Sequence, residues 1–181
     1  MTKALLIIDI QNDYFPGGAN ELVGIAEAAA VAVKVKAHFK SQGLPVIMVQ
    51  HIAIKPGATF FLPDTYGAEL HESLPLEEGD ELVVKHFPNS FRETTLLEVL
   101  KNLNVTDLTI VGMMTHMCVD TTVRAANDLG YQVTLVADAC ATRDLEFAGA
   151  RVAAAQVQTS YLAAIDGSFA SVVSAASVLG P

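Results

Sequence analysis

Residues 107–124 read DLTIVGMMTHMCVDTTVR, an apolar run that ends at a glycine and is followed by a run of helical period. The segment from Leu108 to Val111 is typical of a buried parallel strand. After Cys118 the apolar residues recur at helical spacing until Gly130, which predicts a helix. A thiol at the start of a helix faces unpaired N–H groups and the positive end of the helix dipole, and both favour the nucleophilic thiolate. The alternative is that Cys118 is a small, inert, buried side chain, as most free cysteines are.

The same alternation of apolar strands and helical segments continues along the chain. Further strands are expected at residues 4–8, 46–49, 81–84, 132–137 and 170–173, and helices at residues 21–42, 94–102 and, after an Asp144 cap, up to 164. Strands that alternate with helices indicate a parallel sheet with right-handed crossovers. We therefore expect a single α/β domain over residues 1–181 with a sheet of five to six strands.

Composition excludes several classes of partner and location. The net charge of −9 argues against a nucleic-acid partner, which needs a basic footprint. No apolar run is as long as a membrane span, and the first residues lack the organisation of a signal peptide. Two cysteines are too few for a disulfide framework, so we expect a cytoplasmic protein.

Three of the expected strands end in residues that can carry chemistry. Asp9 follows the first strand, Lys85 the third, and Cys118 follows the strand at residues 108–111. Ligands of open α/β sheets bind beyond the carboxyl ends of the strands, so we expect these side chains to meet there. A nucleophile, a proton acceptor and a cation suit covalent acyl transfer. Alternatively, Asp9 only caps a turn and Lys85 is a solvated surface charge.

Three segments resemble the isochorismatase-like cysteine hydrolase family, and they occur in the family's order. They read IDIQNDYF at residues 8–15, KHFPNSF at residues 85–91 and GMMTHMCVDTT at residues 112–122. The resemblance implies a three-layer αβα sandwich around a mostly parallel, Rossmann-like sheet, and assembly into homodimers or higher homo-oligomers. It also implies that the catalytic triad is Asp9, Lys85 and Cys118.

The resemblance extends to the mechanism. Members of the family have a cis peptide bond before the nucleophile loop, and the matching bond here joins Met113 and Met114. The backbone N–H groups of Met114 and Cys118 would then form an oxyanion hole, while Cys118 attacks an amide-type carbonyl and Asp9 accepts the thiol proton. Two alternatives remain: cleavage of a vinyl ether, which some relatives achieve without the cysteine, and a catalytically silent binding protein on the same fold.

The expected partner is a small-molecule substrate. Its pocket is expected to be lined mainly by residues from the irregular segments between helices and strands. The expected lining residues are Phe15, Phe60, Phe61, Asn89, Phe91 and His116. The segment at residues 51–80 is long for a loop, and its aromatic pair could line an apolar pocket or pack against a second subunit. Asn89 could orient a substrate or brace its own loop.

Neither a cofactor nor a metal is expected. Nicotinamidase relatives carry an Asp and His metal cluster just after the second strand, whereas residues 50–53 here read QHIA. His51, Asp64 and His71 could converge on a metal only in principle. The second cysteine, Cys140, is expected to be structural.

Overall fold

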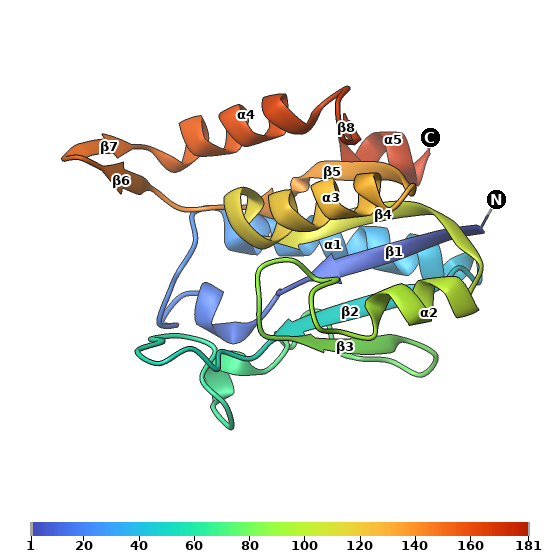
Figure 1. The fold of residues 1–181 in the computed structure, drawn as a ribbon, viewed down its shortest axis with the longest axis horizontal. Helices are drawn as coiled ribbons and strands as arrows, with labels where there is room; N and C mark the ends of the chain where they lie inside the picture. Colours follow the sequence, from blue (N-terminus) through green and yellow to red (C-terminus); the bar gives the residue numbers. More distant parts are fainter. Residues whose placement is uncertain (1, 181) are drawn as a thin grey trace.

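A parallel six-stranded sheet lies between two layers of helices in the computed structural model, which describes residues 2–180 (Figure 1). The strand order is β3-β2-β1-β4-β5-β8. The strands are β1 (Thr2–Ile8), β2 (Val46–His51), β3 (Glu81–Lys85), β4 (Val105–Met113), β5 (Gln132–Ala141) and β8 (Ser171–Val173). The expected three-layer αβα class is confirmed.

Two groups of helices cover the two faces of this sheet. One face carries α1 (Ile25–Ser41) and α5 (Ala175–Leu179), and the other carries α2 (Leu96–Asn102), α3 (Asp120–Asp128) and α4 (Ala154–Ile165) (Figure 1). Short helical turns occupy Asn12–Tyr14, Tyr66–Ala68 and Thr115–Val119. Within residues 2–180, none of the helices combines the length and the apolar character needed to span a bilayer.

β1 is central and has both faces buried. Leu5 and Ile7 pack in the core beneath α1, whereas Ala4, Leu6 and Ile8 pack in the core on the opposite face. A strand that is buried on both faces needs apolar residues at successive positions, which explains the nearly continuous run in the sequence.

The junction of β1 and β4 requires a glycine. Gly112 has a φ of +131°, and a Cβ atom built on it would lie 2.1 Å from the carbonyl oxygen of Ile8. Ile8 is the register partner of Gly112. Because no side chain fits there, the residues that follow the two strands are held close together.

The order in which successive strands are added to the sheet reverses at this same junction. β2 and β3 lie on one side of β1, and β4, β5 and β8 lie on the other. A crevice at such a topological switch point is where open α/β sheets bind their ligands. Asp9 directly follows β1, and the segment Thr115–Val119 comes shortly after the end of β4, so both lie at this point of the sheet.

The largest departure from the expected elements is an antiparallel hairpin between β5 and α4. The helix expected directly after Asp144 begins at Ala154, because β6 (Leu145–Phe147) and β7 (Ala150–Val152) come first. Asp144 nevertheless caps α4, since its Oδ1 accepts a hydrogen bond from the N–H of Ala154 at 2.7 Å.

Other element boundaries differ from the expected ones by a few residues. α1 begins at Ile25 rather than residue 21, because Val23 forms a β-bridge with Thr142 and Gly24 is left-handed with φ 73°. β5 continues through Cys140, so this cysteine lies in a strand rather than a loop, and its thiol donates to the carbonyl of Val136.

Candidate active site

Asp9, Lys85 and Cys118 meet at the carboxyl ends of the strands. The Nζ atom of Lys85 lies 2.8 Å from Oδ2 of Asp9 and 3.2 Å from Sγ of Cys118. A carboxylate oxygen of Asp9 and Sγ of Cys118 lie within 4.8 Å of each other. Asp9 and Lys85 are fully buried and Cys118 is 5% exposed, so the alternative of a solvated lysine is wrong.

The length of the lysine side chain makes this arrangement possible. Lys85 ends β3, which is separated from β1 by β2. Adjacent strands are about 4.8 Å apart, so β3 and β1 are about 10 Å apart. The long lysine side chain, the Asp9 side chain and the 2.8 Å contact between them together bridge this distance. Its side chain crosses the end of β2, where His51 is its register partner.

Asp9 is held in an unfavourable backbone conformation with unused hydrogen-bonding capacity. Its φ is +52°, which non-glycine residues adopt rarely and at a cost of about 1–3 kcal/mol. Apart from the ion pair with Lys85, neither carboxylate oxygen has a hydrogen-bond partner within residues 2–180. A buried acceptor with free lone pairs is suited to receiving a proton.

The surroundings of Cys118 favour the thiol over the thiolate. Cys118 lies inside the π-helical turn Thr115–Val119, which leads directly into α3 at Asp120, so it is near the start of a helix as expected. Burial raises its pKa strongly, the negative charge of Asp9 raises it further, and Lys85 only partly opposes them. The expectation of a low thiol pKa is therefore wrong, because loss of solvation outweighs the helix terminus.

Lys85 is the cation of the site. Burial alone lowers its pKa, but the Asp9 carboxylate and the contact with the Cys118 sulfur together outweigh burial, and the pKa is raised. With Asp9 ionised, the buried carboxylate and ammonium group compensate each other's charge. A removed partner would leave the other charge unpaired in the interior.

The nucleophile turn follows a cis peptide bond between Met113 and Met114. Met114 and Cys118 are both buried, and the N–H groups of Met117 and Val119 bond to the carbonyl of Met114. The role of the Met114 and Cys118 N–H groups as an oxyanion hole stays a prediction.

An aromatic cluster covers the triad from the loop side. Phe61 contacts Tyr14 and His51, with ring centroids 4.6 Å and 5.9 Å away, and Phe60 packs on both Tyr14 and Phe61. Burial raises the pKa of Tyr14 well above its usual range, and the negative charge of Asp9 raises it further, so its phenol lies near Asp9.

The cluster includes two residues that the sequence did not identify as lining the site. Tyr14 lies within the motif at residues 8–15, but its spacing gives no sign that its ring lies near the site. His51 occupies the end of β2, the strand between those that carry Asp9 and Lys85. The strand order was needed to place it.

The other residues expected to line the pocket lie at different distances from Cys118 along the chain and in the fold. His116 lies two residues before Cys118, and its Nδ1 is 2.6 Å from the hydroxyl of Thr142. Burial, followed by the charge of Arg143, lowers the pKa of His116. Phe15 instead stacks on the ring of His71 with 3.5 Å between centroids, beside a separate shallow cavity.

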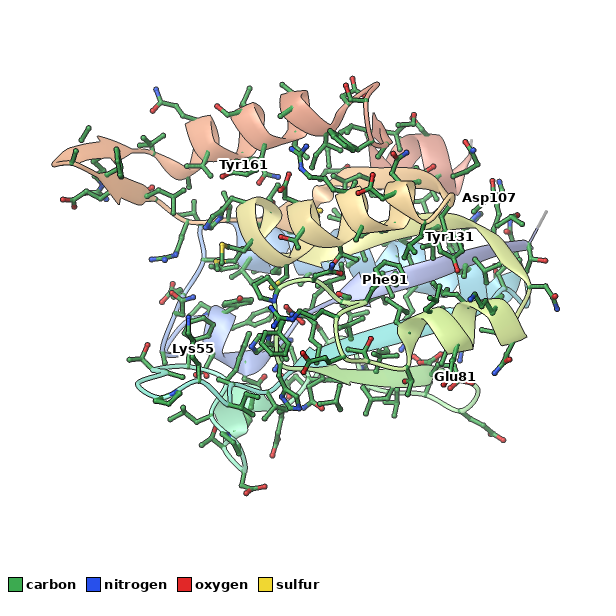
Figure 2. All side chains as sticks on the ribbon, viewed as in Figure 1. Lys55, Glu81, Phe91, Asp107, Tyr131 and Tyr161 are labelled. Atoms are coloured by element: carbon green, nitrogen blue, oxygen red, sulfur yellow. The ribbon has the colours of Figure 1, made fainter. Side chains whose placement is uncertain are left out.

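Phe91 and Asn89 serve the loop after β3. Phe91 packs with Tyr131 on the face that carries α2 and α3, at a centroid distance of 6.3 Å (Figure 2), and its place in the pocket lining stays a prediction. Oδ1 of Asn89 accepts a hydrogen bond from the N–H of Phe91 at 2.9 Å. Of the two alternatives for Asn89, this bond favours bracing of the loop.

The three residues considered for a metal do not converge. His51 groups with Asp9 and Cys118, whose potential ligand atoms lie within 4.8 Å of one another. His71 instead bonds to Ser73 and stacks on Phe15. The ammonium group of Lys85 contacts an atom of Asp9, His51 and Cys118, so a divalent cation among them would meet a positive charge.

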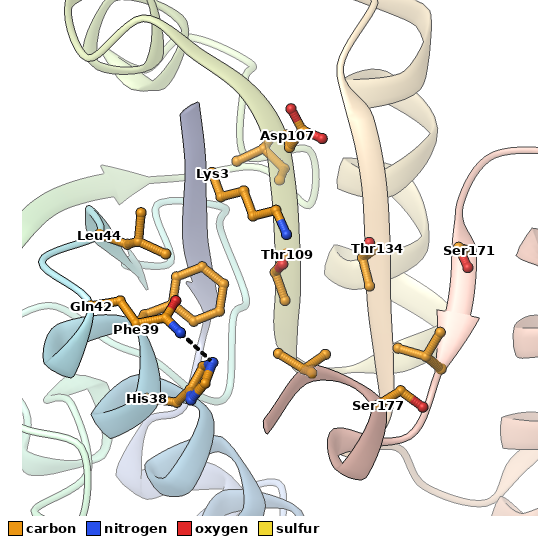
Figure 3. A pocket seen from close by; sticks show the side chains of 13 residues that line it. Lys3, His38, Phe39, Gln42, Leu44, Asp107, Thr109, Thr134, Ser171 and Ser177 are labelled. Atoms are coloured by element: carbon orange, nitrogen blue, oxygen red, sulfur yellow. Dashed lines mark hydrogen bonds between the residues drawn. The ribbon is translucent and has the colours of Figure 1, made fainter. Parts of the chain in front are cut away.

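A cavity of about 320 Å³ lies at the opposite end of the sheet, near the amino ends of β1, β4 and β5 (Figure 3). Its polar lining includes Lys3, Asp107 and Thr134, and the dashed line in Figure 3 joins His38 to Gln42. None of the triad residues lines this cavity, which is therefore separate from the buried acid, amine and thiol.

Comparisons with known proteins point consistently to one family. The Isochorismatase domain model matches residues 3–176, which include Asp9, Lys85 and Cys118. YddQ, an uncharacterized isochorismatase family protein of Bacillus subtilis (strain 168), is 46% identical over 95% of this chain and 96% of its own length. The nicotinamidase of Escherichia coli (strain K12) is 28% identical over 76% of this chain and 82% of its own length. The crystal structure of an isochorismatase-family hydrolase from Oleispira antarctica matches this chain with a TM-score of 0.95. The two sequences are 48% identical, and the match covers 98% of this chain and 96% of the other.

Proposed function

The chain belongs to the isochorismatase family of hydrolases, and we propose that it cleaves an amide-type C–N bond of a small molecule through a thioester on Cys118. One observation carries the proposal: the Lys85 ammonium group lies 2.8 Å from Asp9 and 3.2 Å from the Cys118 sulfur, in an enclosed site. The similarity to a nicotinamidase, whose name specifies an amide substrate, supports the choice of bond.

Attack on the carbonyl begins with a protonated thiol. Because the Cys118 pKa is raised, proton transfer to Asp9 accompanies the formation of the S–C bond. The free lone pairs of Asp9 accept this proton, and Lys85 stabilises the sulfur as negative charge develops on it. General-base catalysis of this kind typically contributes about 10²–10⁴-fold.

The tetrahedral intermediate places a negative charge on the former carbonyl oxygen. We assign the backbone N–H groups of Met114 and Cys118 as its hydrogen-bond donors, each of which would contribute about 2.7–4 kcal/mol. When the intermediate collapses, the C–N bond breaks and Asp9 returns its proton to the departing amine.

Hydrolysis of the thioester repeats the sequence with water. Asp9 takes a proton from the water, whose oxygen attacks the acyl carbon, and the C–S bond then breaks. The sulfur regains its proton from Asp9, which restores the thiol. The acyl group leaves as a carboxylic acid.

The test is a screen of amides, ureides and isochorismate for product release. Cys118→Ala should lower turnover by about 10⁴-fold or more, as loss of a nucleophile does in other covalent hydrolases. Cys140→Ala is the matched control, because Cys140 is also buried and free but bonds to the carbonyl of Val136. Mass spectrometry of the intact wild type should show an acyl adduct on Cys118. Full turnover of a proven substrate by Cys118→Ala would refute the thioester.

A second candidate reaction is hydrolysis of a vinyl ether. The raised pKa of Cys118 and the free carboxylate oxygens of Asp9 favour it, because a carboxyl group alone can move the proton. Isochorismate cleavage that survives Cys118→Ala but is lost in Asp9→Asn would identify this reaction. A silent binding protein would turn over none of the compounds.

A further inference from the structure

His51 lies beside the triad and contacts its lysine directly. The Nζ atom of Lys85 is 2.8 Å from Nδ1 of His51, as near as it is to Asp9. It also approaches the carbonyl oxygen of Phe87 at 3.2 Å and the sulfur of Cys118 at 3.2 Å. Four acceptors therefore surround an ammonium group that has only three N–H donors.

The position of His51 is fixed by a buried glutamine. The side-chain amide of Gln11 accepts a hydrogen bond from the N–H of His51 at 2.8 Å and donates one to its carbonyl oxygen at 2.9 Å. Gln11 is fully buried and donates a second bond to the carbonyl of Ala68. Phe61 packs on the imidazole, so both its backbone and its ring are held in place.

The protonation state of His51 follows from its surroundings. Burial and then the charge of Lys85 lower its pKa to about 4, while Asp9 raises it and His86 lowers it. The imidazole is therefore neutral at neutral pH. Because Lys85 is charged and can only donate, Nδ1 must accept, which leaves the ring proton on Nε2.

We propose that His51 is a positioning residue, whose neutral Nδ1 anchors the ammonium group of Lys85 between Asp9 and Cys118. The inference deepens the proposed function and rests on it for its kinetic consequences. Lys85 extends across the end of β2 on a flexible stem, so each acceptor around its ammonium group limits its rotation. A ring nitrogen of His51 lies within 4.8 Å of an Asp9 carboxylate oxygen and of the Cys118 sulfur, so the bond to His51 holds the cation where it contacts both.

The first test is independent of any substrate. In ¹⁵N-histidine spectra of the whole protein, the His51 signals, assigned by their loss in His51→Asn, should show a neutral ring protonated at Nε2 at pH 7. A ring protonated at Nδ1, or an imidazolium at that pH, would overturn the proposal. This result stands whether or not the amide chemistry is correct.

The second test uses turnover of a substrate from the screen. His51→Leu keeps the approximate size of the side chain but lacks the acceptor, and kcat should fall about 100-fold, as for a misplaced group, while KM changes little. His51→Asn places an amide oxygen where Nδ1 was, and it should retain most of the activity. His38→Leu, a histidine substitution at the opposite end of the sheet, is the matched control.

The outcomes separate the two proposals. Wild-type kcat in a folded His51→Leu, or equal losses in the leucine and asparagine variants, would overturn the role of Nδ1 while Cys118 dependence still supports the hydrolase. If His51→Leu does not fold, the comparison of His51→Asn with wild type and the tautomer measurement decide. Activity without Cys118 dependence would remove the proposed function and leave the tautomer result untouched.

Discussion

Asp9 and Asp80 each place a carboxylate beyond the reach of solvent, 2.8 Å from the ammonium group of a buried lysine. The two differ in what else they bind. Asp80 pairs with Lys36 and Lys40 and accepts a hydrogen bond from the N–H of Glu77. Asp9 has its single ion pair with Lys85 and no hydrogen bond to either oxygen within the described chain.

The difference distinguishes a structural ion cluster from a reactive one. The Asp80 cluster, which comprises Lys36, Lys40, Glu77 and Asp80, fixes the loop before β3 on α1. Its acceptors are used, so it has nothing left to offer a ligand. Asp9 retains an unpaired oxygen, Oδ1, even though an unsatisfied buried polar group costs about 1–3 kcal/mol. Such a cost is expected where a substrate, a thiol or water uses the free acceptor.

The largest expected effect is on activity, in Asp9→Asn. The amide keeps the shape of the carboxylate but cannot accept the proton, so kcat/KM should fall by about 10²–10⁴-fold. Steady-state kinetics on a proven substrate would measure it. Asp80→Asn, the same substitution at the other carboxylate, should leave kcat/KM close to wild type, and similar losses in both variants would remove the distinction.

The next effect is on stability, in Asp80→Asn. Lys36 would be left buried without its nearest charge, and the free energy of unfolding should fall by about 3 kcal/mol in urea titrations. Burial alone raises the pKa of Asp80, but hydrogen bonds from Lys36 and Lys40 outweigh it and lower the pKa. Asp80 therefore stabilises the fold at neutral pH and loses this contribution as the pH falls through its lowered pKa. The variant should lack that acid-induced loss, and its persistence would contradict the assignment.

A third effect concerns the thiol beside Asp9. Burial raises the pKa of Cys118, and burial also raises that of Cys140 to about 12. Unfolded thiols ionise near pH 8.5, so above that pH the unfolded state has lost protons that the folded state retains. Each thiol should lower the free energy of unfolding by about 1.4 kcal/mol per pH unit in that range. Urea titrations of Cys118→Ala between pH 8 and 10 should show a shallower decline than wild type, and parallel curves would contradict a buried neutral thiol.

The smallest effect is expected for Lys40→Met. Lys40 is the more exposed of the two lysines in the Asp80 cluster, with 29% of its side chain accessible, and Lys36 remains to pair with Asp80. Exposed ion pairs contribute about 0–1 kcal/mol, so the urea midpoint should barely move. A loss as large as that of Asp80→Asn would mean that Lys40, and not Lys36, holds the cluster together.

The fold and the meeting of Asp9, Lys85 and Cys118 could be predicted because both follow from strand ends. Apolar runs identify buried strands, and parallel strands bring their last residues to one edge, which places Asp9, Lys85 and the segment with Cys118 together. The sequence could not supply the strand order that puts His51 between Asp9 and Lys85. Nor could it give the degree of burial, which reversed the expected pKa of the thiol.

The missed hairpin has a local explanation. Residues 144–164 are rich in alanine and favour a helix, but Ala148 and Gly149 both adopt left-handed φ angles of 51° and 78°. Such a pair makes the tight turn that joins two antiparallel strands, for which Asn-Gly or Asp-Gly is the usual signal. Alanine at the first position gave no such sign.

The hydrogen bond that caps α4 also joins the two ends of the β6–β7 hairpin. The bond from Ala154 to Asp144 closes the base of the hairpin, so the chain leaves the body and returns at nearly the same point. The projecting arm, whose Phe147 is 85% exposed, therefore resembles a detachable module (Figure 1). Loops whose ends already meet tolerate exchange well. A protein engineer could graft a recognition peptide or a reporter between these two residues and leave the helix, with the chemistry beneath it, in place.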